Sequence, residues 1–401
     1  MAGFRVRGQP AALDIVARAV VSERPPNAIL IAGPERVGKT TLALDLAAGL
    51  LCLAEEPTER PCRSCVSCCK VEHGNHPDLH RVAPAGAGGQ IRIDQARSLI
   101  VDLALHPLEG RFRVAIVAAA ERLNPDGQNA LLKTLEEPPA GAVLILCADD
   151  ETLLLDTVRS RCTRIRCGAV AAATIAELLV ERGVADPSTA AGIARLADGR
   201  PGLAMALAAS PDVLVHRARL ARSLLDLADA GRRQRLAAGP ALLADAATVA
   251  EVIDRRDGER AADDLASAGG VRDAASRPSS ARDVAGGDWV SDADGPASPT
   301  PSDGRTRAAP AVRRAASLAL IETWREVARD LLVVLAGGDS FVRDLALLED
   351  YERVAVGTSI DEVAAFLARL DGLAAAIEAY ANPDLVVDVL LLAWPRTRLA
   401  A

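Results

Sequence analysis

Aromatic side chains are scarce in this chain: phenylalanine, tryptophan and tyrosine together make up 2% of its 401 residues. Hydrophobic residues nevertheless reach 50%, so buried cores have to be built mainly from Leu, Val, Ile and Ala. That composition favours helices and parallel strands over an aromatic-rich β-sandwich. The length exceeds what one compact core usually holds, which predicts two or three domains.

The chain also lacks an excess of basic residues and any long apolar run. Its formal net charge is −8, so contact with a nucleic acid would need a local basic patch. No segment approaches the roughly 18 uninterrupted apolar residues of a membrane span, and residues 1–7 lack the apolar core of a signal peptide. We therefore expect no membrane association and a cytoplasmic location, where the eight cysteines would not form disulfides.

A phosphate-binding loop of the pattern G-x-x-x-x-G-K-T lies between a predicted strand at 28–32 and a predicted helix at 39–51. In this pattern backbone amides close around phosphate oxygens at a helix N-terminus. Lys39 would reach the β and γ phosphates, and Thr40 would offer its hydroxyl to magnesium. ATP or ADP is the ligand that the loop implies. The candidate nucleotide-binding residues are Gly33, Gly38, Lys39, Thr40 and Thr41.

The strand that should complete this site carries no acid. It is predicted at 113–117 and continues into three alanines, of which Ala118 and Ala119 stand where magnesium and the attacking water need carboxylates. Glu121 follows four residues beyond the strand end, where we expect a surface role. The sequence therefore predicts a nucleotide site without hydrolysis.

Five of the eight cysteines lie within eighteen residues. Two Cys-x-x-Cys steps in series and one upstream cysteine supply the four thiolates of a tetrahedral zinc site. Buried inert thiols are the competing interpretation, which the polar residues of the segment disfavour. A closed four-thiolate site is structural and not catalytic. The predicted ligands are Cys52, Cys62, Cys65 and Cys68, with Cys69 spare and His73, His76 and His80 as alternatives.

The remaining segments are arranged in an order that predicts three domains. Another strand at 143–147 and a helix that begins after Asn124 alternate with the elements above, which implies a parallel sheet. Short helices follow at 169–208, and longer helical segments lie on either side of a stretch rich in Asp, Gly, Ser and Pro that we expect to be disordered. The predicted ranges are 1–168 for the α/β domain, 169–208 for a small helical domain, 209–254 and 313–401 for a C-terminal helical domain, and 255–312 for the insertion.

Several motifs, taken in order, resemble those of one family. They are Gly8-Gln9-Pro10, the phosphate-binding loop, the cysteine module, the string from Asn129 to Pro139 that reads NALLKTLEEPP, and Ser160-Arg161-Cys162. In this order they resemble bacterial clamp-loader subunits, the AAA+ proteins of the DNA polymerase III holoenzyme, over residues 4–208. The resemblance implies a RecA-like AAA+ domain with a zinc module, a helical lid and an all-α C-terminal collar.

Three departures favour the delta-prime branch of that family over the ATP-hydrolysing gamma/tau branch. Ala118 and Ala119 occupy the positions where the family has its two acids, and the polar sensor position falls in Cys147-Ala148-Asp149. Glycine stands where the lid should carry its sensor arginine. The resemblance also implies partners: gamma/tau and delta subunits in a hetero-pentamer, and through that complex the sliding clamp and primer-template DNA.

The resemblance assigns a role to Arg161, which on composition alone would be part of a solvated basic turn. In this family the arginine of the Ser-Arg-Cys triplet reaches across the subunit interface to the γ-phosphate bound by a neighbour. Arginine fingers of this kind accelerate phosphoryl transfer by about 10³–10⁵, and lysine lacks the planar fork that the role requires.

Two other functions are consistent with the motifs. One is a gamma/tau-like ATPase that uses a displaced acid such as Glu121. The other is a nucleotide-sensing scaffold outside replication.

Overall fold

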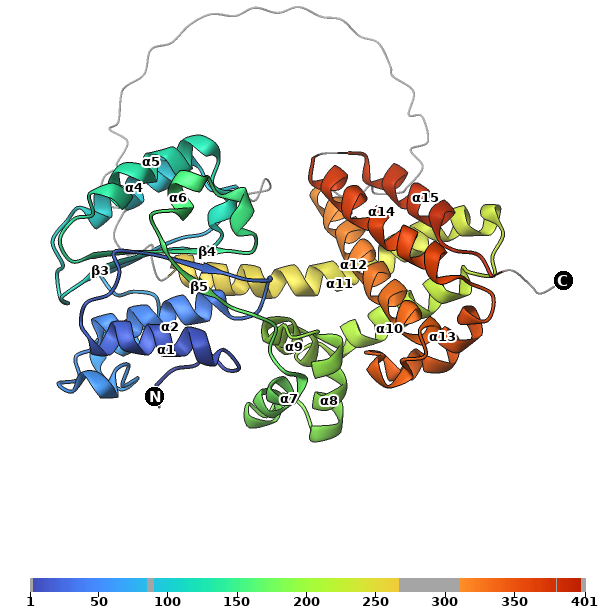
Figure 1. The fold of residues 1–401 in the computed structure, drawn as a ribbon, viewed down its shortest axis with the longest axis horizontal. Helices are drawn as coiled ribbons and strands as arrows, with labels where there is room; N and C mark the ends of the chain where they lie inside the picture. The colour runs from blue at the N-terminus through green and yellow to red at the C-terminus, as the bar shows by residue number, and fades with distance from the viewer. Residues whose placement is uncertain (1–2, 85–89, 267–309, 380, 398–401) are drawn as a thin grey trace, which may run out of the picture.

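The computed structural model describes residues 3–84, 90–266, 310–379 and 381–397 (Figure 1). The first part of the chain is an α/β layer in which five parallel strands form one sheet in the order β2-β3-β4-β1-β5. Its elements are α1 (Pro10–Val21), β1 (Ala28–Ala32), α2 (Lys39–Leu51), α3 (Val66–Glu72), β2 (Leu79–Val82), α4 (Ile93–Leu103), β3 (Arg113–Val117), α5 (Pro125–Glu136), β4 (Ala142–Ala148), α6 (Asp156–Arg159) and β5 (Thr163–Arg166).

Helices cover both faces of this sheet. Along β1, Ile29 and Ile31 join a core with α1 and α2, whereas Ala28 and Leu30 join a second core with α4 and α5. Successive side chains of a strand point to opposite faces, so a strand buried on both sides is apolar throughout. Figure 1 shows α1 and α2 below the sheet and α4 and α5 above it. The predicted α/β parallel-sheet class is confirmed.

Three of the five strands were predicted. The ranges 28–32 and 113–117 are confirmed, and β4 is one residue longer at each end than the predicted 143–147. The predictions missed β2 and β5, the two strands at the edges of the sheet. Both carry charged or polar side chains and have one fully buried residue each, Leu79 and Ile165, so they lack the apolar pattern of a central strand.

Three short helices follow the sheet and pack on one another around a separate small core. Proline begins α8 and α9, where its missing N–H costs no hydrogen bond. The loop between these two helices contacts both neighbouring parts of the chain. The helices are α7 (Ala172–Glu181), α8 (Pro187–Leu196) and α9 (Pro201–Ala208).

The C-terminal part is helical, and its core contains the largest group of aromatic side chains. Trp324, Phe366 and Trp394 contact one another with ring centroids 4.9–6.2 Å apart, so this core is less purely aliphatic than the composition suggested. Among the described residues, none of the helices combines the length and the apolar character needed to cross a lipid bilayer. The helices are α10 (Pro211–Asp226), α11 (Arg232–Ala266), α12 (Pro310–Leu335), α13 (Leu348–Ala355), α14 (Ile360–Glu378) and α15 (Pro383–Ala393).

The ends of the predicted disordered insertion are helical. Helix α11 continues to Ala266 and α12 begins at Pro310, so residues 255–266 and 310–312 belong to helices. The segment 259–266, Glu-Arg-Ala-Ala-Asp-Asp-Leu-Ala, consists largely of good helix formers, a preference that its high polarity obscured. Residues 267–309 lie outside the described part of the chain.

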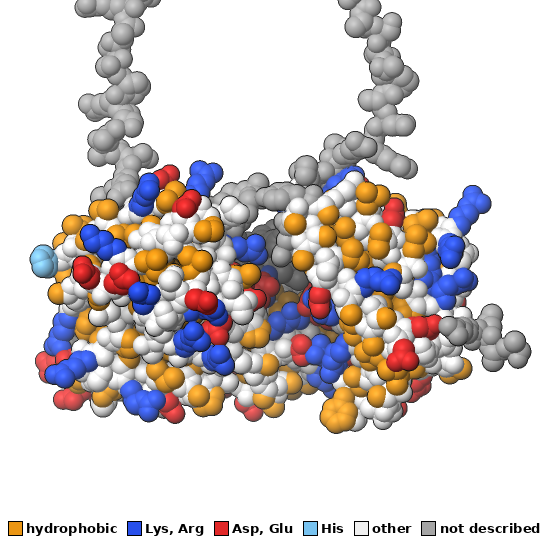
Figure 2. Space-filling view, turned by 45° about the horizontal axis from the view of Figure 1, so that its top comes forward, with side chains coloured by type: hydrophobic (Ala, Val, Ile, Leu, Met, Phe, Trp, Pro, Cys, Tyr) orange, Lys and Arg blue, Asp and Glu red, His pale blue; other side chains and the backbone are white. Residues whose placement is uncertain are grey.

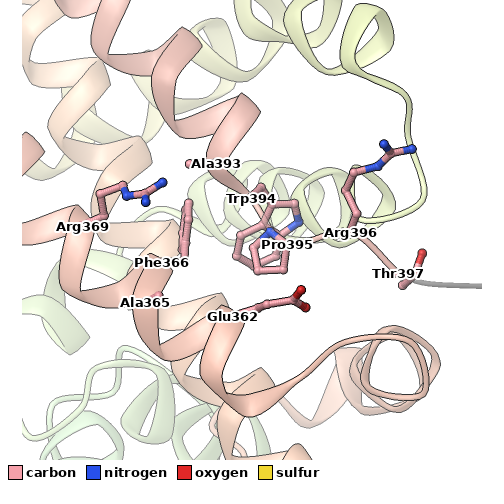
Figure 3. A pocket seen from close by; sticks show the side chains of 9 residues that line it. All are labelled: Glu362, Ala365, Phe366, Arg369, Ala393, Trp394, Pro395, Arg396 and Thr397. Atoms are coloured by element: carbon pink, nitrogen blue, oxygen red, sulfur yellow. The ribbon is translucent and has the colours of Figure 1, made fainter.

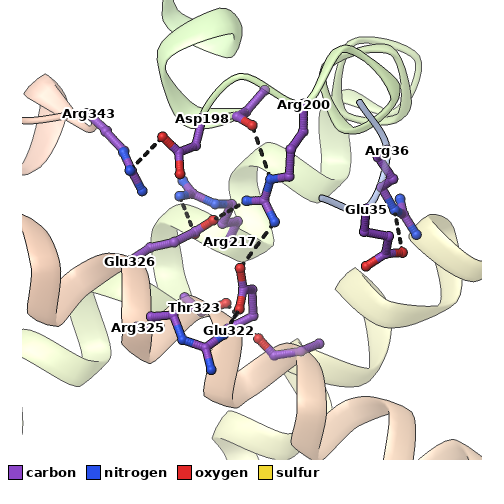
Figure 4. A network of polar contacts seen from close by, with 12 residues as sticks. Glu35, Arg36, Asp198, Arg200, Arg217, Glu322, Thr323, Arg325, Glu326 and Arg343 are labelled. Atoms are coloured by element: carbon purple, nitrogen blue, oxygen red, sulfur yellow. Dashed lines mark hydrogen bonds and ion pairs between the residues drawn. The ribbon is translucent and has the colours of Figure 1, made fainter. Parts of the chain in front are cut away.

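A network of charged side chains joins the α8–α9 loop to the C-terminal helices (Figure 4). Arg200 donates to Glu322 at 3.1 Å and to Glu326 at 3.3 Å, both on α12. Glu326 also accepts from the buried Arg217 of α10 at 2.6 Å. In the same loop Asp198 pairs with Arg343 at 2.5 Å. These ion pairs thus orient the small helical domain; Arg200, Arg217 and Glu326 are mostly withdrawn from solvent, whereas Asp198 and Glu322 are partly exposed.

We expect Glu326→Ala to destabilise the C-terminal helical part by about 2–3 kcal/mol, because it removes one partner of a buried charge. Arg217 would keep only Asp344, whose carboxylate lies 3.5 Å away. The measurement is the urea midpoint followed by tryptophan fluorescence, since Trp324 and Trp394 lie in this core. Asp371→Ala is the matched control, because the exposed Asp371 pairs with Arg325 outside the core. Equal midpoints for the two variants would contradict the expectation.

Candidate functional site

The phosphate-binding loop connects β1 to α2 as predicted. Gly33 is required by a close approach, since a Cβ there would lie 2.0 Å from the carbonyl oxygen of Cys167. Gly38 adopts a φ of 104° immediately before the helix, a backbone conformation that other residues rarely adopt. Thr40 and Thr41 lie half-buried in the first turn of α2. The loop therefore lies between a strand and a helix, where its sequence pattern places it.

The ammonium group of Lys39 is bound by three oxygens of this chain. Its Nζ donates to the carbonyl oxygens of Gly33 at 2.8 Å and Pro34 at 2.7 Å, and it forms an ion pair with Asp149. The lysine side chain is 6% exposed and that of Asp149 44%. An ammonium has three protons to donate, so all three are in use.

Asp149 reaches Lys39 because of the pairing between β1 and β4. The two strands are parallel with Ala32 opposite Ala148, and the amide of Gly33 donates to the carbonyl oxygen of Ala148 at 3.2 Å. The first residues beyond the two strands are therefore neighbours. We had placed Asp149 at the sensor position but did not predict its pairing with Lys39. An acid directly after a buried strand, at the carboxyl edge of a parallel sheet, was the available signal.

Glu121 also lies at this edge of the sheet, and the expectation of a surface role for it is wrong. It follows β3 in a short 3₁₀ turn (Ala120–Arg122), and its Oε2 is buried without a hydrogen-bond partner. Burial is the main cause that raises the pKa of Glu121, and the negative charge of Asp149 raises it further. No carboxylate precedes it, because Ala118 and Ala119 occupy the positions directly after β3.

The small helical domain contacts the phosphate-binding loop through its backbone. The amide of Gly202, at the start of α9, donates to the carbonyl oxygen of Arg36 at 2.9 Å. A Cβ at Gly202 would lie 3.0 Å from that oxygen, so glycine permits the contact. Arg200 points instead to Glu322 and Glu326 of α12 (Figure 4). The arginine nearest to the expected sensor position is therefore directed toward the C-terminal helices.

The four predicted zinc ligands come together in one cluster. The Sγ atoms of Cys52, Cys62, Cys65 and Cys68 all lie within 4.8 Å of one another. A zinc ion with Zn–S bonds of about 2.3 Å holds its sulfurs about 3.8 Å apart in a tetrahedron, which this cluster fits after a small contraction. Four backbone amides donate to three of these sulfurs at 3.4–3.5 Å, and such hydrogen bonds stabilise thiolates.

The thiols of the cluster differ in their tendency to ionise. Burial raises the pKa of Cys52 and Cys68, so their thiolates need a cation nearby. Burial opposes ionisation of Cys62 as well, but hydrogen bonds from Ser64 and its neighbours lower that pKa to about 6. The donor set is therefore one that a metal ion would complete.

The alternative zinc ligands have other partners. His73 bonds through Nδ1 to the carbonyl oxygen of Cys69 at 2.7 Å. His76 uses both ring nitrogens, one with Ser67 at 2.9 Å and the other with the amide of Asp78 at 3.0 Å. His80 pairs with Asp102 at 3.4 Å. Within the described chain, the group that could hold a metal ion consists of the four cysteines, and Cys69 stands outside it.

Arg161 lies in the turn between α6 and β5, at the surface. It donates to the carbonyl oxygen of Thr157 at 2.9 Å and pairs with Glu136 at 2.6 Å. Glu136 ends α5 and belongs to the string 129–139. The two side chains of this pair are 36% and 51% exposed, so the pair contributes at most about 1 kcal/mol. The guanidinium is available to exchange Glu136 for another anion.

The face drawn in Figure 2 carries Lys and Arg interspersed with Asp and Glu, and it is hollowed between the sheet part and the C-terminal helices. A pocket of about 520 Å³ opens elsewhere, in the C-terminal part. Figure 3 shows Phe366 and Trp394 in its middle, with Arg369 and Arg396 toward its two ends. It contains none of the predicted site residues.

The parallel sheet, the loop between β1 and α2 and the attached small helical domain form a RecA-like AAA+ fold. Residues 8–170 match the family described as "DNA polymerase III, delta subunit". The chain is 33% identical to the DNA polymerase III subunit delta-prime of Bacillus subtilis over 176 residues, which are 44% of this chain and 52% of that protein. Over this region the chain is therefore related to DNA polymerase III subunits named delta-prime.

Other DNA polymerase III subunits are also similar to this chain. The tau subunit of Escherichia coli is 34% identical over 165 residues, which are 41% of this chain and 25% of that protein. A solved gamma subunit-related protein of DNA polymerase III from Thermotoga maritima is similar over 95% of this chain and 97% of its own, with 17% identity and a TM-score of 0.42. The match spans about half the length of the delta-prime relatives.

Removing one cysteine of the cluster should abolish zinc binding, because three thiolates leave a tetrahedral ion with an open position. We expect about one zinc per chain for the unmodified protein and a large loss for Cys65→Ser, as measured by plasma mass spectrometry of purified protein. Cys69→Ser is the matched control and should retain the metal. Loss of zinc from the Cys69 variant, or its retention by the Cys65 variant, would refute the assignment of ligands.

Proposed function

We propose that this chain is a delta-prime-type clamp-loader subunit that does not hydrolyse ATP. Its role is to complete a hetero-pentamer with gamma/tau and delta subunits, and to supply Arg161 in trans to a neighbouring gamma/tau ATP site. The complex would load the sliding clamp on primer-template DNA in the cytoplasm. The relation of residues 8–170 to delta-prime subunits supports this family role.

One observation carries the non-hydrolytic assignment. The two positions directly after β3 are Ala118 and Ala119, so nothing there can anchor magnesium or orient water as a nucleotide hydrolase requires. The loop lysine is already paired within the chain. We therefore expect this chain to contribute to hydrolysis through a residue at its surface and not through its own loop.

Arg161 suits such a contribution. Its guanidinium is exposed, always charged and planar, with donors spaced for a phosphate. It lies in the turn after α6, where only the weak pair with Glu136 and one carbonyl oxygen hold it. A γ-phosphate on a neighbouring subunit carries more charge than Glu136 and would replace it at little cost.

The second candidate is a gamma/tau-like ATPase, and the position of Glu121 favours it. That carboxylate lies at the same sheet edge as Lys39 and has a buried oxygen without a partner. ATP turnover by the purified chain separates the two functions. Robust hydrolysis that Lys39→Ala abolishes would establish the ATPase and refute our proposal. A pull-down that recovers neither gamma/tau nor delta would instead favour a nucleotide-sensing scaffold outside replication.

Arg161→Ala should lower the DNA-stimulated ATPase rate of the reconstituted complex. The hydrolysis rate at the ATP site that receives this arginine should fall by about 10³-fold or more. The total rate of the complex should therefore fall by the fraction that this site contributes. Arg161→Lys should behave like the alanine variant, because it keeps the charge and loses the fork. Arg166→Ala is the matched control: Arg166 is 75% exposed and pairs with Glu151. An unchanged rate for Arg161→Ala in an assembled complex would refute the finger role.

A further inference from the structure

In the phosphate-binding loop of this chain, Lys39 already forms an ion pair with a carboxylate of the same chain, that of Asp149. We propose that Asp149 is an internal counter-ion that occupies Lys39 and excludes the phosphate chain of nucleoside di- and triphosphates from the loop. Asp149 is then the residue that determines whether this loop binds nucleotide. The inference concerns the loop alone and does not depend on the role of the chain in a clamp loader.

The position of Asp149 is fixed by the sheet. Because Ala148 lies opposite Ala32 in the β1–β4 pair, residue 149 leaves the sheet beside Gly33, at the mouth of the loop. No loop rearrangement is needed for the carboxylate to meet the ammonium. The ion pair joins residues 110 positions apart, so it depends on strand order as well as on the sequence of the loop.

Lys39 has no proton left for a phosphate. Its three donors bind two carbonyl oxygens of the loop and the Asp149 carboxylate. A bound β or γ phosphate would have to replace at least one of these acceptors, and Asp149 is the only one that carries charge. A phosphate that enters while Asp149 stays would place two anions on one ammonium, which like-charge repulsion disfavours.

A second carboxylate strengthens the exclusion. Glu121 lies close enough to Asp149 for that charge to contribute to its raised pKa, and its Oε2 has no hydrogen-bond donor. Two acids therefore lie near each other at the edge of the sheet at which the loop begins. A phosphate on Lys39 would add a further negative charge beside them.

The contact with the small helical domain keeps the loop in this arrangement. The amide of Gly202 donates to the carbonyl oxygen of Arg36 in the middle of the loop. Arg200, two residues earlier, is bound to α12 through Glu322 and Glu326 (Figure 4). The loop is thus held from the lid side by a segment that is itself anchored to the C-terminal helices.

The alternative hypothesis is that the same residues form a magnesium site. The carboxylates of Asp149 and Glu121 would then bind the metal of a Mg–ATP complex, and Lys39 would turn to the phosphates. The two readings predict opposite effects of neutralising Asp149. Under exclusion the change strengthens nucleotide binding with or without magnesium, and under metal binding it weakens binding when magnesium is present.

The test is titration of the full chain with a fluorescent ADP analogue, with magnesium and with EDTA. We expect Asp149→Asn to bind at least about tenfold more tightly than the unmodified chain in both conditions. Lys39→Ala in the Asp149→Asn background should abolish the gain. Asp150→Asn is the matched control, because it removes the same charge one residue later from a side chain that accepts from Thr152; its affinity should be unchanged.

Several results would overturn the proposal. They are micromolar binding by the unmodified chain, unchanged affinity of a folded Asp149→Asn variant, or weaker binding by that variant in magnesium. Asp149→Ser provides a second neutral side chain, and circular dichroism establishes that each variant is folded. If Asp149→Asn unfolds, the same gain is required of Asp149→Ser, and its absence refutes the exclusion.

Discussion

The in-register pairing of β1 with β4 determines what this chain can do with its phosphate-binding loop. Parallel strands bring their carboxyl ends to one edge, which is where ligands bind in open α/β sheets. At this edge Lys39 follows β1, Asp149 follows β4 and Glu121 follows β3. The strand pairing that places a nucleotide site at this edge therefore also brings Lys39 next to the residue after β4. When that residue is an acid, the two form an ion pair.

The α8–α9 loop connects this edge to the rest of the molecule. Gly199 accepts from the amide of Val170, Gly202 donates to Arg36, and Arg200 binds two glutamates of α12. Glycine favours the positive φ of 75° at position 199 and permits the close approach at 202. Charged and backbone contacts thereby connect the C-terminal helices to the backbone of the phosphate-binding loop.

Much of the α/β part could be predicted because local patterns encode it. The central strand β1 is uniformly apolar, β3 is apolar after its first residue Arg113, and the cysteine spacing groups Cys52 with its three partners before any fold is known. The edge strands β2 and β5 were missed because they are buried on one side and carry polar residues. The pair between Lys39 and Asp149 was missed for another reason: strand order brings the residues together, and strand order is not a local property.

The retention of an intact loop pattern without the acids of hydrolysis has a structural cause. Helix α2 begins at Lys39, and most of its length is buried against the sheet. Its Asp45 accepts from the amides of Arg5 and Val6 and pairs with Arg63 of the cysteine module. A disrupted loop would displace this helix and with it the sheet core, the N-terminal segment and the cysteine cluster. The close approach at Gly33, the positive φ of Gly38 and the burial of α2 therefore constrain the loop, whether or not it binds a phosphate.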